Sequence, residues 1–121
     1  MDQTLFALPI LPGKSEAARA FLAELEGERK GQYATSEGRL RLTKEVWAIQ
    51  PTGQGDLFVV YFAGQNIGHA FQQFATSQDE FDRWFKQRVR ETTGADLNTP
   101  PPGPMSQILR HRSGEPREAQ Q

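Results

Sequence analysis

The chain contains no cysteine, which excludes disulfide bonds, thiolate nucleophiles and cysteine-ligated zinc or iron–sulfur sites. Its only two histidines, His69 and His111, lie far apart, and no His, Asp and Glu residues show metal-ligand spacing. The segment Gly53-Gln54-Gly55 lacks the later glycine and the Lys-Ser/Thr pair of phosphate-binding loops. No serine sits in a nucleophile-elbow pattern. The sequence therefore predicts no bound metal and no cofactor.

Excess charge and long apolar runs are also lacking. Fourteen basic residues nearly balance fifteen acidic ones, so nothing global attracts the chain to nucleic acid or to an anionic membrane. No stretch approaches the roughly 20 apolar residues of a membrane span. The first residues, Met1-Asp2-Gln3, show neither the basic nor the apolar region of a signal peptide. We expect a cytoplasmic protein without nucleic-acid or membrane partners.

What is present is a set of three strands, Thr4–Ile10, Leu40–Gln50 and Leu57–Ala63, with apolar side chains on both faces. The short loop 51–55 predicts that the second and third strands pair as a hairpin. Along Leu57–Ala63, alternate residues on each side are apolar. Along Leu40–Gln50, alternation separates Leu40, Leu42, Val46 and Ala48 from Arg41, Thr43, Glu45, Trp47 and Ile49.

Helical periodicity appears in three segments, which begin near Ser15, Ile67 and Ser77. Ser15 is a candidate N-cap, Ser77 and Glu80 match a capping box, and Gly94 is placed to end the last helix. The apolar stripes are Ala18, Phe21, Leu22 and Leu25; Ile67, Ala70, Phe71 and Phe74; and Phe81, Trp84, Phe85 and Val89. The polar segment 28–38 is either a short helix or an arm that folds over the sheet.

The order of elements predicts an α+β fold of the ferredoxin-like β-α-β-β-α-β type. Its antiparallel sheet would have four strands, the last at Gln107–Arg110, with the helices on one face. Residues 1–112 would form one domain, and the polar segment Ser113–Gln121 would be disordered. The other face of this sheet would be apolar and larger than most monomers leave exposed. We therefore expect a homodimer that buries the open face against a second copy.

Two segments support a family resemblance. The element order, together with Thr43-Lys44-Glu45-Val46-Trp47 and Asp79-Glu80-Phe81-Asp82-Arg83-Trp84-Phe85, resembles the dimeric α+β barrel superfamily over about Leu5 to Leu109. Within it, the chain is similar to small bacterial proteins of unknown function, distantly akin to antibiotic-biosynthesis-monooxygenase-like proteins. This resemblance implies a dimeric α/β barrel and no assigned activity. Haem-degrading members resemble one another in an Asn on the first strand, which Thr4–Ile10 lacks.

Three residues are candidate catalytic groups. Glu45, beside Thr43 and Trp47, would act as a base if its face lines a pocket; otherwise it is a rim glutamate paired with Lys or Arg. Tyr61 would donate to a carbonyl or an oxyanion, or else be a core or interface tyrosine. His69 would be a general base or a haem ligand, or else a surface histidine.

Two further groups are candidate ligand contacts. Tyr33 near the polar segment would cover a pocket mouth. Asp82-Arg83-Trp84 would hold a polar ligand, whereas helical spacing favours a core Trp84 with exposed charged neighbours. Two functions follow: binding of a small apolar or aromatic molecule, or cofactor-free monooxygenase- or cyclase-like catalysis on an aromatic or polyketide-like substrate by proton transfer in a dry pocket.

Overall fold

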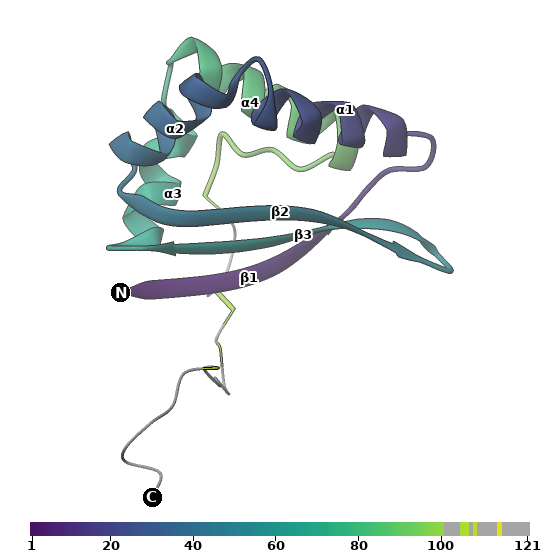
Figure 1. Ribbon diagram of the computed structural model, residues 1–121, viewed down its shortest axis with the longest axis horizontal. Helices are drawn as coiled ribbons and strands as arrows, with labels where there is room; N and C mark the ends of the chain where they lie inside the picture. Colours follow the sequence, from purple (N-terminus) through teal and green to yellow (C-terminus); the bar gives the residue numbers. More distant parts are fainter. Residues whose placement is uncertain (101–104, 107, 109–113, 115–121) are drawn as a thin grey trace, which may run out of the picture.

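The computed structural model describes residues 1–100, 105, 106, 108 and 114. Its elements follow the order β1 (Asp2–Pro9), α1 (Ser15–Glu26), α2 (Lys30–Arg39), β2 (Leu42–Thr52), β3 (Gly55–Gly64), α3 (Ile67–Thr76) and α4 (Glu80–Thr93). The strands form one antiparallel sheet in the order β1-β3-β2. Helices α1, α2 and α4 lie over one side of this sheet (Figure 1).

The hairpin of β2 and β3 is confirmed. Thr52 pairs with Gly55, so only Gly53 and Gln54 connect the strands, a length typical of tight hairpins. Gly55 has a φ of 123°, a conformation that side chains with a Cβ rarely adopt. Pro51 lies near the end of β2, an edge strand, where its missing N–H removes no essential ladder bond.

The predicted four-stranded ferredoxin-like sheet is wrong. In the described residues the sheet has three strands, and four helices accompany it. The prediction placed a last strand at 107–110, where only Ile108 is described and belongs to no strand. Beside the free edge of β1, the Ser106 hydroxyl instead accepts from the Leu5 N–H at 2.9 Å. The predicted tail 113–121 and His111 lie outside the described residues, apart from Gly114.

The helix predictions need two corrections at their N-termini. Ser15 is not the N-cap of α1, because Lys14 holds that position without a side-chain bond. Ser77 forms no capping box with Glu80; Asp79 caps α4 by accepting from the N–H groups of Phe81 and Asp82. Gly94 does end α4, with a φ of 81°.

The two faces of the sheet differ sharply. Phe58, Val60 and Phe62 of β3 are buried beneath the helices. On the opposite face Leu5 is 44% exposed and Val46 is 46% exposed. Segment 28–38 does not shield that face, because α2 packs beside α4 on the helical side. The arm alternative is therefore wrong.

Candidate functional site

A cavity of about 490 Å³ lies between the sheet and the helices. Its size falls within the range of small-molecule sites in proteins. Six of the eight phenylalanines line it, together with Tyr33 and Trp47, and most of its wall is apolar. The polar or titratable side chains in the wall are few: Thr4, Tyr33, Ser36, Glu45, Trp47, Asp96, Thr99 and Ser106.

A β-bulge near the start of β2 decides which residues reach this cavity. The pairing with β3 shifts between Leu42 and Lys44, so Thr43 is an extra residue without a partner in the register. As a result Leu42 and Glu45 both line the cavity, although strict alternation would place them on opposite faces. Thr43 is exposed instead, and its hydroxyl donates to the Ala63 carbonyl at 3.2 Å.

Glu45 is the centre of a small polar group in this apolar wall. The indole Nε1–H of Trp47 donates to Glu45 Oε2 at 2.8 Å. The phenol of Tyr33 and the carboxyl group of Glu45 also influence each other's pKa. The carboxyl groups of Glu37 and Glu45 likewise influence each other's ionisation. Tyr33 and Glu37 are four residues apart on α2, so one face of this helix presents both.

The electrostatics of this group favour a protonated Glu45. Burial is the largest cause that raises the pKa of Glu45, to about 8, and the negative charge of Glu37 adds to it. The hydrogen bond from Trp47 acts in the opposite direction. Burial also raises the pKa of Glu37 and that of Tyr33. The protonated form of Glu45 is therefore favoured at pH 7.

The cavity brings together only some of the predicted site residues. Tyr33, Glu45 and Trp47 line it. Tyr61 lies on the open face of the sheet, where its hydroxyl donates to Gln3 Oε1 at 2.9 Å. His69 is exposed at the start of α3, and only its backbone N–H is engaged, by the Asn66 side chain.

Trp84 and Thr43 also lie apart from the cavity wall. Trp84 packs against Phe21 and Phe81, and the Arg29 guanidinium lies 4.2 Å from its ring centroid. Trp84 instead borders a smaller hollow between α1 and α4. The predicted ligand contacts through Trp84 and Thr43 are therefore not supported by their positions.

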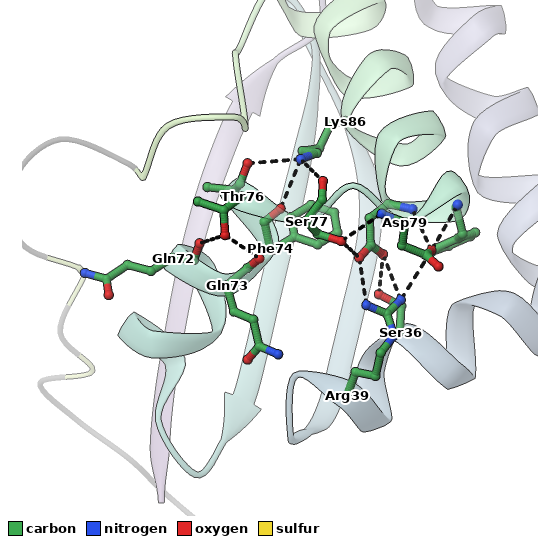
Figure 2. A network of polar contacts seen from close by, with 12 residues as sticks. Ser36, Arg39, Gln72, Gln73, Phe74, Thr76, Ser77, Asp79 and Lys86 are labelled. Atoms are coloured by element: carbon green, nitrogen blue, oxygen red, sulfur yellow. Dashed lines mark hydrogen bonds and ion pairs between the residues drawn. The ribbon is translucent and has the colours of Figure 1, made fainter.

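Figure 2 shows a second polar cluster that includes Ser36, Arg39 and Ser77. It surrounds Asp82, whose side chain is fully buried. Its carboxylate accepts from Ser36 at 2.7 Å and from Ser77 at 2.6 Å, and Arg39 donates at 3.0 Å. Desolvation acts to raise the pKa of Asp82, but these hydrogen bonds and the charge of Arg39 outweigh it and lower the pKa. The expectation of an exposed Asp82 is wrong, because α2 covers this face of α4.

Lys86 lies in the same region and is also buried, at 4% exposure. Its ammonium group donates to the carbonyl oxygens of Phe74, Ala75 and Ser77 at 3.0–3.1 Å. These carbonyls end α3 and begin the loop to α4, so Lys86 satisfies groups that a helix C-terminus leaves without partners. Figure 2 shows Lys86 reaching this turn. Both charged residues thus fix α4 to its neighbours.

Sequence reasoning missed Glu37, Ser36 and Asp96. A helical reading of segment 28–38 would have placed Tyr33 and Glu37 on one face, so the spacing carried a usable signal. Ser36 and Asp96 reach the cavity through the docking of α2 and the course of the chain after α4, which no local pattern specifies.

Comparison of the chain with protein-family models, curated proteins and solved structures found no significant match. The superfamily resemblance therefore stays a prediction. Within the residues that the structure describes, no helix is long and apolar enough to cross a membrane. In the same residues no three His, Asp or Glu side chains gather as a metal site.

Proposed function

We propose that this protein binds a small, mainly apolar or aromatic molecule in the cavity between the sheet and the helices. The observation that carries the proposal is the cavity itself, about 490 Å³ with a largely apolar wall that includes six phenylalanines. A few convergent polar groups at Glu45 would orient one polar end of the ligand, as in most small-molecule sites. Burial of the ligand's apolar surface supplies the affinity.

Calorimetry with a simple neutral aromatic alcohol, 1-naphthalenemethanol, tests this proposal. At about 0.5 kcal/mol per heavy atom, a Kd on the order of 10–100 μM is expected. Ala70→Leu, which adds volume to the cavity wall, should weaken binding at least tenfold, whereas Ala23→Leu on an exposed part of α1 should not. Leu42→Trp provides a second filling variant if the first does not fold. Equal affinity in both filling variants and the wild type would reject the cavity as the site.

Native mass spectrometry of the purified protein complements this titration. A retained molecule of a few hundred daltons in the wild type, absent from the Ala70→Leu variant, would support the proposal and identify the ligand class. A molecule retained equally by both would place it elsewhere on the protein.

A second candidate function is cofactor-free, cyclase-like catalysis, and the position of Glu45 favours it. A carboxyl group with a pKa of about 8 that lines a largely apolar cavity is suited to proton transfer near neutral pH. Its carboxylate would remove a proton from a carbon next to a carbonyl group, and the electron pair would move to the carbonyl oxygen as an enolate. This step needs no oxidant, unlike a monooxygenase reaction.

Hydrogen–deuterium exchange of the methyl group of 2-acetylnaphthalene, followed by NMR, tests this alternative. Exchange should accelerate with added wild-type protein and rise with pH up to about 8, because the base is the deprotonated Glu45. Glu45→Gln should return the rate to that of buffer, and Glu80→Gln should not. A Glu45→Gln variant as fast as the wild type would eliminate Glu45 as the base.

We propose further that the open face of the sheet pairs with a second copy. Apolar side chains of all three strands meet there, including the exposed Leu5 and Val46, and Lys44 is the one charged residue of the strands on that side. A face with so little charge suits a copy of itself better than a charged partner. Light scattering should give twice the chain mass for the wild type and one chain mass for Val46→Asp. A wild-type monomer at micromolar concentration would refute the pairing.

A further inference from the structure

The titratable groups that line the cavity all belong to acids or phenols. They are Glu45, Asp96 and Tyr33, and the negative charge of Glu37, which is not among the lining residues, acts on Glu45. In the described part of the chain no Lys, Arg or His lines the cavity. The buried carboxylate of Asp82 differs from these acids, because it forms an ion pair with Arg39. The carboxyl pair of Glu37 and Glu45 thus lacks a positive partner within the cavity.

We propose that the preferred ligand is a hydrophobic amine, an aromatic molecule with one protonated nitrogen that lies against Glu45. This inference rests on the proposed function, since it names the ligand class of the same cavity. The ammonium group would replace the proton that Glu45 holds and would donate to its carboxylate. The aromatic body would lie among the phenylalanines.

The aromatic wall supports the same ligand class. Phe6, Phe62 and Phe71 contact one another at ring-centroid distances of 5.3–6.2 Å and form one side of the cavity. Tyr33 and Phe81 lie 6.2 Å apart on the helical side. Aromatic faces attract cations through their negative quadrupole, so this lining accommodates a positive charge better than an aliphatic one would. An anionic ligand would be repelled by the acidic pair.

Binding of the cation and ionisation of Glu45 should be coupled. The groups that face Glu45 are Tyr33 and Glu37 from α2 and Trp47 from its own strand, and Glu26 of α1 acts on Tyr33 and Glu37. None of them is positive, so below about pH 8 the free site holds a proton that the amine must displace. Amine affinity should rise roughly tenfold between pH 6 and pH 7, with release of about one proton per ligand.

Calorimetry with a shape-matched pair of probes tests the inference. 1-Naphthylmethylamine and 1-naphthalenemethanol differ only in the amine and the hydroxyl group. At pH 7.5 the wild type should bind the amine about tenfold more tightly than the alcohol. Titrations in buffers of different ionisation enthalpy should show proton release with the amine and none with the alcohol.

The control variants separate this inference from the proposed function. Glu45→Gln should reduce the amine-to-alcohol preference from about tenfold to about one, whereas Glu16→Gln, at an exposed position on α1, should keep most of it. Binding of the alcohol with no preference for the amine would overturn the ligand class and leave the cavity proposal standing. Absence of binding for both probes would overturn the cavity proposal as well.

Discussion

The carboxyl groups of Asp82 and Glu45 lie in contrasting environments within the same fold. Asp82 accepts from Arg39, Ser36 and Ser77, and these partners lower its pKa despite burial. Glu45 has Trp47, Tyr33 and another acid as its partners, and its pKa rises to about 8. The two pKa values shift in opposite directions because Asp82 has Arg39 beside it, whereas Glu45 has no cation among its partners. A carboxylate with a cation and full hydrogen bonding fixes helices in place, whereas a carboxyl without one keeps a proton available for a ligand or a reaction.

The largest expected effect is the loss of stability when Asp82 is replaced. Asp82→Ala would leave Arg39, Ser36 and Ser77 without their common acceptor, so the free energy of unfolding should fall by about 3 kcal/mol. Urea denaturation at pH 7 measures it. Asp56→Ala is the control, because its ion pair with the exposed Arg19 spans 3.9 Å and should contribute under about 0.5 kcal/mol. Equal losses in the two variants would show that the Asp82 cluster has no special structural role.

Glu45→Gln should raise the free energy of unfolding, the opposite of Asp82→Ala, and the size of this increase should depend on pH. The pKa of Glu45 is raised on folding, so its contribution is fully present below about pH 4.5 and is lost as the pH rises to about 8. The neutral amide avoids this loss. The variant should match the wild type at pH 5 and be more stable at pH 8.5 by on the order of 2 kcal/mol, measured by urea denaturation. A variant less stable than the wild type at pH 8.5 would contradict the burial of an unpaired carboxyl.

Lys86→Met tests whether the buried cation is structural. The substitution keeps an apolar stem but removes the donor to three carbonyl groups at the end of α3, at a cost of about 1–2 kcal/mol. Thermal unfolding measures it, and Lys30→Met at an exposed site is the control. If the two variants unfold at the same temperature, water satisfies these carbonyl groups as well as Lys86 does.

The smallest effect is expected from the two tyrosines. Tyr33→Phe removes the hydroxyl that acts to lower the pKa of Glu45, so this pKa should rise further while stability changes by under about 1 kcal/mol. Carbon-13 NMR titration of the Glu45 carboxyl measures the pKa directly. Tyr61→Phe removes only a contact with Gln3 on the other face, so it should leave that pKa unchanged. A pKa shift of equal size in both variants would show that Tyr33 has no specific effect on Glu45.

Local patterns sufficed for much of the fold and part of the site. Periodicity located α1, α3 and α4, and the short loop before Gly55 predicted the hairpin. Alternation also placed Glu45 and Trp47 together on one face of β2. It failed at Thr43, because a bulge inserts one unpaired residue and turns Leu42 inward in its place. It failed at Tyr61 because an apolar strand with two apolar faces does not reveal which face the helices cover.

The amino-acid sequence by itself determined an α+β chain with amphipathic helices, an apolar sheet and no thiol chemistry, because these depend on residue type and short-range spacing. Only the tertiary structure decided which acid meets a cation. Asp82 lies 43 residues from Arg39, and Glu45 reaches Tyr33 and Glu37 only when α2 docks on the sheet. The ionisation of a carboxyl group depends on its solvation and on charges within a few ångströms. Those distances are set by packing between distant segments, and the sequence pattern does not encode them locally.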